Sequence, residues 1–321
     1  MEYFFIKINN VVFRMALDNE IAVQMIKRVS SLNSCTSRLS YDVDITCTRI
    51  QHINFTDEKF LYQQEPNINV DCYYREIFDL GIFNYQRKEK LLNISYLDSE
   101  KYPFNSFEVV VDTILQFIYL IMLEFEIVPL HAAVLAYKNK AILLFGNSGS
   151  GKSTLELALL NSGFLFFSDD IAFLDDRNRI FNSGEHIIAC SEESKEIVSK
   201  SLGITFKDTG IKDSVNKQII DVNRAMISEC EELEPFMIIF PSSSGIKDGA
   251  FKKISAKSTF VDLIKLTVST LFSLEQKQIY IKRIKALSEN TQAYRYSWTN
   301  RNIDLKKICD NVWELCEQDG V

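Results

Sequence analysis

The spacing of hydrophobic residues in the first hundred positions predicts a small α+β unit. Residues 4–16 are rich in Phe, Ile and Val and predict one or two strands around the turn-prone pair Asn9-Asn10. Residues 19–32 place apolar side chains on one helical face. Residues 41–46 alternate polar and apolar, as a half-buried strand does, and residues 88–98 form another strand region. None of these residues has recognisable chemistry, so we predict an accessory domain over residues 1–100.

The pattern changes after a break at residues 101–103, and we predict a second, α/β domain over residues 101–321. Its first elements are a helix over residues 106–126, a strand over residues 129–135 and a wholly apolar strand over residues 141–145. A wholly apolar strand is typical of a sheet that is covered on both faces. Further along we predict an irregular acidic stretch over residues 229–234, then a strand, a helix and a final amphipathic helix, over residues 236–241, 255–272 and about 305–315.

Composition excludes several functional classes. The 321 residues are 46% hydrophobic and 25% charged, which is typical of a globular protein. The net charge of −7 argues against binding to nucleic acid, because such proteins need a basic surface. The most apolar run, residues 109–123, is interrupted by polar residues and is shorter than the roughly 20 residues that span a bilayer. The seven cysteines contain no C-x-x-C pair and no secretion signal is visible, so we expect a cytoplasmic protein without a membrane partner.

A glycine-rich segment follows the apolar strand at residues 141–145 and satisfies the Walker A pattern G-x-x-x-x-G-K-[ST] in full. Glycines allow successive backbone N–H groups to point into one concave nest, and the following helix adds its positive dipole end. In such a loop the lysine reaches the β- and γ-phosphates and the Ser hydroxyl binds Mg²⁺. We therefore predict an ATP·Mg²⁺ site made by Gly146, Asn147, Ser148, Gly149, Ser150, Gly151, Lys152, Ser153 and Thr154.

Two adjacent carboxylates stand between predicted strands at residues 164–167 and 171–174. Asp169 and Asp170 lie in a strongly apolar stretch, where like charges are unfavourable unless a cation or a proton relieves them. Mg²⁺ beside bound phosphates would supply that relief, and the second carboxylate could take the proton of an attacking hydroxyl. The alternative is an exposed turn. The next acidic pair, Asp175-Asp176, is predicted to be the tip of a hairpin.

His131, the glycine-rich segment and the aspartate pair all fall within residues 131–170, and this compact order resembles one family. In Ras-like and AAA-type ATPases the metal-binding acid comes from a strand much further along. The order here is similar to the HPr kinase/phosphorylase family and, more distantly, to ATP-dependent phosphoenolpyruvate carboxykinase. The resemblance is specific over residues 130–174 and implies a P-loop kinase core with a mixed sheet. A glycine-containing segment that this family uses for dephosphorylation and HPr docking is absent, so the chain looks more like stand-alone HPr-kinase-like enzymes of peptide-modification systems.

The resemblance implies a role for each of the matching residues. Lys152 would hold phosphate, Ser153 and Asp169 would bind Mg²⁺, and Asp170 would be the general base, although the two aspartates could exchange roles. His131 would lie close to the transferred phosphoryl group; without the resemblance, a lone histidine in an apolar strand is more often a core residue. Lys217 could neutralise charge on that group, the alternative being an exposed lysine on a hairpin.

These observations favour an ATP-dependent kinase that phosphorylates a Ser or Thr hydroxyl of a peptide or small protein, such as a ribosomal precursor peptide. Three alternatives remain. The same ATP site could serve a small-molecule kinase, or ATP could order a loop in a regulator that transfers no group. A decarboxylating carboxykinase is the third, but the chain is short for that family and its additional metal ligands are not identifiable.

Overall fold

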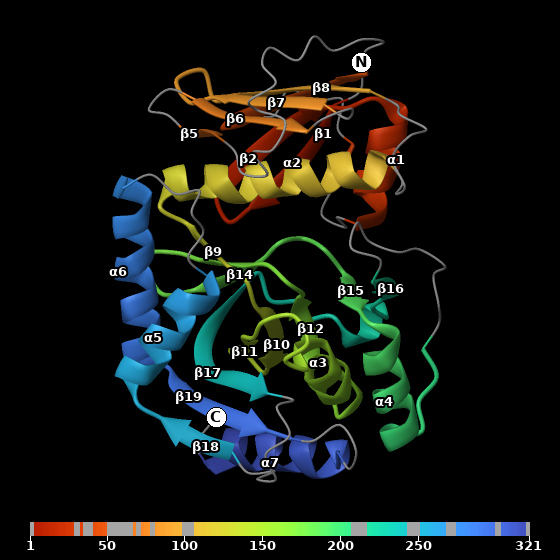
Figure 1. Ribbon diagram of the computed structural model, residues 1–321, viewed down its shortest axis with the longest axis vertical. Coiled ribbons are helices and arrows are strands. Elements are labelled where there is room, and N and C mark those ends of the chain that lie inside the picture. The colour runs from red at the N-terminus through yellow and green to blue at the C-terminus, as the bar shows by residue number, and fades with distance from the viewer. Residues whose placement is uncertain are drawn as a thin grey trace. The chain divides into compact units, whose positions relative to one another are not determined.

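The computed structural model describes residues 3–28, 33–34, 41–49, 67–68, 72–77, 81–97, 106–206, 217–242, 251–267, 274–298 and 303–318. The chain divides into two compact units. The first comprises Met1–Glu126 with Ser269–Ile279, and the second comprises Ile127–Val268 with Tyr280–Val321. The architecture is mixed α/β (Figure 1).

The first unit is built on an eight-stranded sheet within the described residues. Strands β1 (Phe4–Ile8) and β2 (Val11–Ala16) form an antiparallel hairpin that turns at Asn9, a residue with φ of 52°. This confirms the predicted pair of strands. The spatial order is β3-β1-β2-β4-β8-β7-β6-β5. The remaining strands are β3 (Asn33–Ser34), β4 (Val43–Arg49), β5 (Asn67–Ile68), β6 (Cys72–Ile77), β7 (Gly81–Gln86) and β8 (Leu91–Tyr96).

Two helices accompany this sheet, α1 (Asn19–Arg28) and α2 (Ser106–Met122), the latter continued by a short 3-10 helix over Leu123–Phe125. Helix α2 lies along the sheet (Figure 1), and the ring of its Phe117 stacks on Phe83 of β7 at 5.9 Å. We predicted a domain boundary between residues 100 and 101, which would place this helix in the second domain. The compact units instead separate after Glu126, because α2 packs on the first sheet. A division into two functional domains stays a prediction.

The second unit contains a mixed sheet in which β17 (Glu232–Ser242) is central. This strand runs parallel to β11 (Lys140–Leu144) and to β19 (Gln292–Ser297), and antiparallel to β14 (Ile180–Asn182). Along one path the order is β12-β10-β11-β17-β14-β13-β9. The other strands of this sheet are β9 (Val128–Leu130), β10 (Ala133–Tyr137), β12 (Leu165–Ser168), β13 (Ala172–Leu174) and β18 (Phe251–Ile254).

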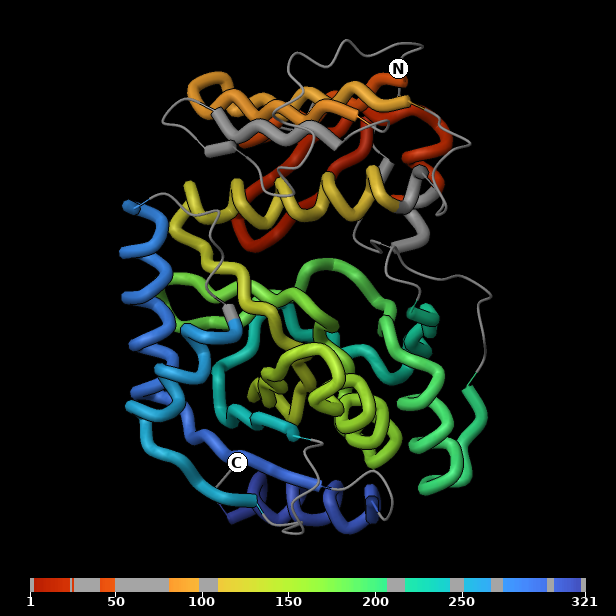
Figure 2. Tube along the Cα trace, viewed as in Figure 1, coloured from red at the N-terminus to blue at the C-terminus, as the bar shows by residue number. Residues whose placement is uncertain are grey.

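Helices and a small separate sheet complete the second unit. The two-stranded sheet pairs β15 (Ile187–Cys190) with β16 (Gln218–Asp221). Figure 2 follows α3 in yellow-green at the centre of this unit and α7 in dark blue at the end of the chain. The helices are α3 (Lys152–Asn161), α4 (Glu192–Leu202), α5 (Ala256–Thr267) and α7 (Leu305–Gln318), together with α6 (Leu274–Asn290) from Tyr280 onward, its first residues being counted in the first unit. No helix in the described ranges is long and apolar enough to cross a membrane.

Two local predictions in this unit were wrong. The single strand predicted over residues 129–135 is broken at His131 and Ala132: β9 pairs with β13, whereas β10 pairs with β11 and β12. The irregular acidic stretch predicted over residues 229–234 holds only for residues 229–231: Glu232 begins β17, where the charges of Glu232 and Glu234 pair with arginine and lysine side chains. The turn predicted at residues 175–178 is confirmed as the connection between β13 and β14.

Candidate functional site

The glycine-rich segment connects the buried strand β11 to helix α3, as the sequence predicted. Two of its glycines adopt backbone conformations that other residues rarely take: φ is 78° at Gly149 and 94° at Gly151, which caps the N-terminus of α3. A third, Gly146, leaves no room for a side chain, because a Cβ there would lie 2.2 Å from the Ser150 Oγ. The loop therefore needs glycine at three positions to curl tightly above the helix.

The two aspartates follow β12 and separate into different environments. Asp169 is buried, and its two carboxylate oxygens accept the backbone N–H groups of Asp170 and Ala189, each at 2.8 Å. Asp170 has a left-handed backbone with φ of 56°, a conformation that Asp tolerates better than most residues. This turn of the backbone sends the second carboxylate into a cavity that the first does not line.

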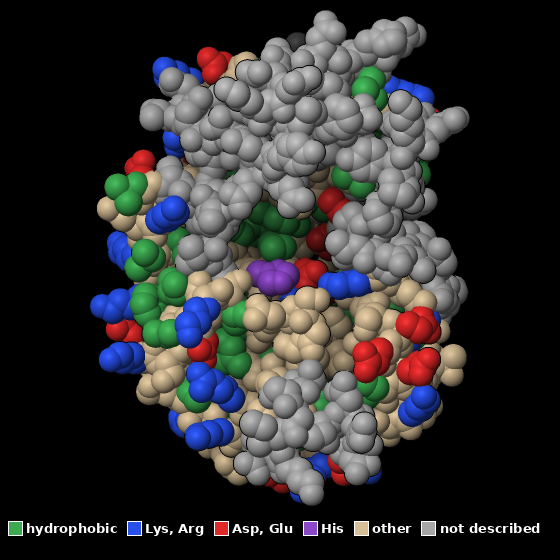
Figure 3. Space-filling view, in the orientation of Figure 1, with side chains coloured by type: hydrophobic (Ala, Val, Ile, Leu, Met, Phe, Trp, Pro, Cys, Tyr) green, Lys and Arg blue, Asp and Glu red, His purple; other side chains and the backbone are tan. Residues whose placement is uncertain are grey.

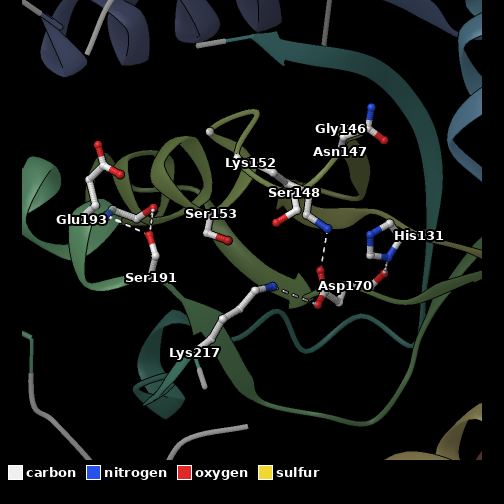
Figure 4. A pocket seen from close by; sticks show the side chains of 13 residues that line it. His131, Gly146, Asn147, Ser148, Lys152, Ser153, Asp170, Ser191, Glu193 and Lys217 are labelled. Carbon is white, nitrogen blue, oxygen red and sulfur yellow. Dashed lines mark hydrogen bonds and ion pairs between the residues drawn. The ribbon is translucent and has the colours of Figure 1, made fainter. Parts of the chain in front are cut away.

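Asp170 is surrounded by positively charged and titratable groups (Figure 4). The Lys152 Nζ donates to its Oδ1 at 2.5 Å, and the Lys217 Nζ lies 4.0 Å from its Oδ2. The Nδ1 of His131 lies 3.1 Å from the backbone carbonyl oxygen of Asp170. In the space-filling view a histidine, an acidic and a basic side chain lie next to one another at the surface (Figure 3). The three side chains that approach Asp170 come from three separate segments of the second unit.

The charges in this cluster shift one another's pKa values. Burial alone would raise the pKa of Asp170, but the positive charge of Lys152, with His131 and Lys217, lowers it overall. Burial opposes ionisation of Lys152, yet Asp170 and Asp169 raise its pKa. The pKa of His131 is lowered by desolvation and by the nearby Lys152. We therefore describe Lys152 and Asp170 as an ion pair and His131 as a neutral imidazole at neutral pH.

These groups line one cavity of about 290 Å³ in the second unit. Most of the predicted site residues are brought together there: His131, Gly146, Asn147, Ser148, Gly149, Gly151, Lys152, Ser153, Asp170 and Lys217. Three predicted residues do not line it, namely Ser150, Thr154 and Asp169. The side chain of Thr154 is buried and donates to the Ser194 Oγ at 3.0 Å, so it joins α3 to α4.

Sequence reasoning missed the rim formed by the N-terminus of α4, which contributes Ser191, Glu193 and Ser194 to the cavity. Ser191 is the N-cap, and its Oγ accepts the backbone N–H of Ser194 at 3.2 Å. The signal was present in the sequence, because a serine followed by two glutamates is typical of a helix N-terminus.

A second missed residue is Glu156, which lies one turn into α3 and is completely buried. Neither of its carboxyl oxygens accepts a hydrogen bond from the described residues. Burial, followed by the negative charge of Asp169, raises its pKa well above the ordinary value. Burial and the charge of Asp170 also raise the pKa of Asp169, to about 7. Asp169 accepts two backbone N–H groups and Glu156 accepts none, so Glu156 is the carboxyl of the two that more strongly favours its protonated form.

The donor set is compatible with Mg²⁺ bound together with phosphates. Mg²⁺ prefers oxygen ligands and commonly takes only one or two carboxylates from the protein. The Ser153 hydroxyl lines the cavity and makes a long hydrogen bond, 3.3 Å, to the carbonyl of Ala189. The Asp169 oxygens each keep a further lone pair beside their hydrogen bonds. In the described ranges no group of three His, Cys, Asp or Glu residues could form an all-protein metal site.

Comparisons with known proteins add little to this geometry. No family model matches the sequence, and no curated protein matches it. Among solved structures, the HPr(Ser) kinase/phosphatase from Coxiella burnetii is 15% identical, and the match covers 59% of this chain and 91% of that chain with a TM-score of 0.31. A TM-score this low describes no more than a distant likeness.

Proposed function

We propose that this protein transfers the γ-phosphoryl group of ATP to a Ser or Thr hydroxyl of a peptide or small protein. One observation supports this most directly. The ammonium of Lys152, which is the lysine of the complete Walker A segment and the first residue of α3, lies 2.5 Å from the Asp170 carboxylate in the same cavity. A phosphate-binding cation and a candidate base are thus adjacent, as phosphoryl transfer requires.

The loop and helix α3 would bind the triphosphate. Backbone N–H groups of the glycine-rich turn and the first turn of α3 are suited to anionic oxygens, and the helix dipole favours negative charge there. Lys152 would exchange part of its contact with Asp170 for the β- and γ-phosphates. Lys217 stands on the other side of Asp170 and would contact the transferred phosphoryl oxygens.

Asp170 would act as the general base. Its carboxylate accepts the proton of the acceptor hydroxyl while that oxygen forms a bond to the γ-phosphorus. The bond from the γ-phosphorus to the oxygen that bridges to the β-phosphorus breaks, and ADP leaves with that electron pair. The neutral His131 ring lies at the wall of the cavity, with its Nδ1 beside the backbone carbonyl of Asp170. Through this contact it would orient the reacting groups.

Mg²⁺ would neutralise phosphate charge when it is bound with ATP. In this proposal Ser153 and Asp169 hold it, as the sequence predicts. A cytoplasmic location, where ATP and Mg²⁺ are available, is part of the proposal. The peptide acceptor is supported by the resemblance of residues 130–174 to HPr-kinase-like enzymes.

The test compares wild type with Asp170→Asn, with labelled ATP and two sets of acceptors, Ser-containing peptides and hydroxylated metabolites. We expect the variant to lose transfer but to keep ATP binding in calorimetry, because Asn cannot accept the proton. Asp176→Asn, at an exposed turn position, is the matched control and should transfer at the parental rate.

Each of the other results has a specific meaning. Transfer by Asp170→Asn at the parental rate would exclude Asp170 as the base. Phosphorylation of metabolites alone would identify a small-molecule kinase. Binding of ATP without any transferred product, in the presence of all acceptors, would favour the nucleotide-binding regulator instead.

A further inference from the structure

One contact of the glycine-rich segment, residues 146–153, is not explained by the proposed chemistry; we call this segment the phosphate loop. A Cβ built on Gly151 would lie 2.0 Å from the Cζ2 atom of Trp298 and 2.6 Å from its Cη2 atom. Gly151 caps α3 and also lines the cavity. The outer ring of the indole therefore presses directly on the loop residue at which the helix begins.

Trp298 is held in place by parts of the fold that are remote from the loop in sequence. It follows β19 and is 5% exposed. Its backbone N–H donates to the carbonyl of Ser242 at 2.9 Å, which extends the parallel pairing of β17 with β19. The ring of Tyr296 lies 5.7 Å from its ring. The indole is thus a fixed surface, because the central sheet and the core, and not the loop, determine its position.

The second tryptophan of the chain lies at the opposite end of the same helix. The Trp313 Nε1 donates to the carbonyl of Ser162, the C-cap of α3, at 3.1 Å. Its ring also packs on Phe164 at 4.7 Å. The two tryptophans of the chain thus lie at opposite ends of α3, Trp298 against Gly151 and Trp313 near Gly163.

We propose that Trp298 is a positioning residue for phosphate binding. The indole supports Gly151 from behind and holds the loop N–H groups in the arrangement that receives the triphosphate. This rests on the proposed function only in taking ATP as the ligand. Preorganised donors bind an anion better than donors that must first be ordered, so removal of the ring should weaken binding without a change in any group that touches ATP.

The first experiment uses fluorescence and affinity. Trp313→Phe leaves Trp298 as the single tryptophan, and its emission should change when ATP is added. Trp298→Phe leaves Trp313 and removes the Cζ2 and Cη2 atoms that contact Gly151. This variant should show no change in emission and bind ATP about tenfold more weakly in calorimetry, a difference of about 1.4 kcal/mol. The proposal would be overturned if both variants bound ATP with equal affinity and the emission of Trp298 did not change on addition of ATP. If wild type still bound ATP in that case, the proposed function would be unaffected.

The second experiment needs no nucleotide. In the free protein the N–H of Ser150 donates to Asn147 and the N–H of Leu155 donates to Gly151, each at 3.0 Å. Hydrogen exchange followed by mass spectrometry should show faster exchange over residues 146–155 in Trp298→Phe and Trp298→Leu. Trp313→Phe should instead affect residues near 162. Unchanged exchange over 146–155 in Trp298→Phe would refute the support role even if wild type fails to bind ATP, so the two failures are distinguishable.

Discussion

The buried Glu156 offers a sharp test of the electrostatics beneath the site. Glu156→Gln keeps the size and shape of the side chain but removes its titration. Glu156 is completely buried, accepts no hydrogen bond from the described residues and lies near Asp169. Its carboxyl therefore favours the protonated form in the folded protein, whereas in the unfolded chain it ionises near its ordinary pKa of 4.5.

The sign of the effect follows from proton linkage. Above pH 4.5 the unfolded chain releases a proton that the folded protein retains at Glu156, so rising pH stabilises the unfolded state. Wild type should lose about 1 kcal/mol of unfolding free energy for each pH unit, until Glu156 also ionises in the folded state. Glu156→Gln lacks the contribution of Glu156, whereas Asp169, whose pKa is also raised, keeps its own contribution in both proteins. The variant should match wild type below the ordinary pKa of 4.5 and become progressively more stable above it.

Thermal or urea unfolding followed by tryptophan emission measures this difference. Both Trp298 and Trp313 belong to the second unit, so the signal reports the unit that contains Glu156. A gain of 1 kcal/mol should raise Tm by about 2 to 4 °C in a unit of this size. Glu196→Gln, on the exposed face of α4, is the control and should change little at any pH. A Glu156→Gln variant that is less stable than wild type at high pH would show that Glu156 is ionised and paired, which would refute the reasoning.

Three further predictions concern single side chains. Lys217→Ala should lower kcat by about ten- to a hundredfold and change the KM for ATP much less, because Lys217 approaches Asp170, the proposed base; steady-state kinetics with an equally lowered affinity for ATP would contradict this role. Asp175→Ala should reduce the free energy of unfolding by about 1 to 3 kcal/mol in urea titrations, since this buried carboxylate accepts the backbone N–H groups of Arg177 and Arg179, and a neutral result would show that the turn does not need them. Gly163→Ala should destabilise the protein by about 1 kcal/mol because φ is 104° there, while a Cβ would meet the Trp313 ring only at 3.5 Å; an unchanged Tm would show that the backbone relaxes.

The sequence predicts best what is specified by adjacent residues. The strand, the glycine turn and the helix over residues 140–161 were predicted almost to the residue. The reason is that the apolar run, the glycines and the helical pattern that specify them follow one another directly in the sequence. The break at His131 was not anticipated, since the residues on both sides of it, 128–130 and 132–136, are apolar. The two strands differ only in their partners: β10 pairs with its neighbour β11 and with β12, whereas β9 pairs with β13, a segment that is distant in sequence. The Trp298 contact with Gly151 joins positions that are further apart still.

For the aspartate pair, residue type and position in the sequence do not determine where each carboxylate lies. The resemblance implied Asp169 as the metal ligand and Asp170 as the base, but it left open that the two exchange roles. The structure distinguishes them by one backbone angle: the left-handed φ of 56° at Asp170 turns its carboxylate toward Lys152, while that of Asp169 stays beneath the surface on two backbone N–H groups. A left-handed non-glycine residue is unfavourable by about 1 kcal/mol or more, and the ion pair that Asp170 forms with Lys152 opposes this cost. The arrangement of the two carboxylates thus depends on contacts between residues 152 and 189. These contacts cannot be predicted from the two adjacent aspartates alone.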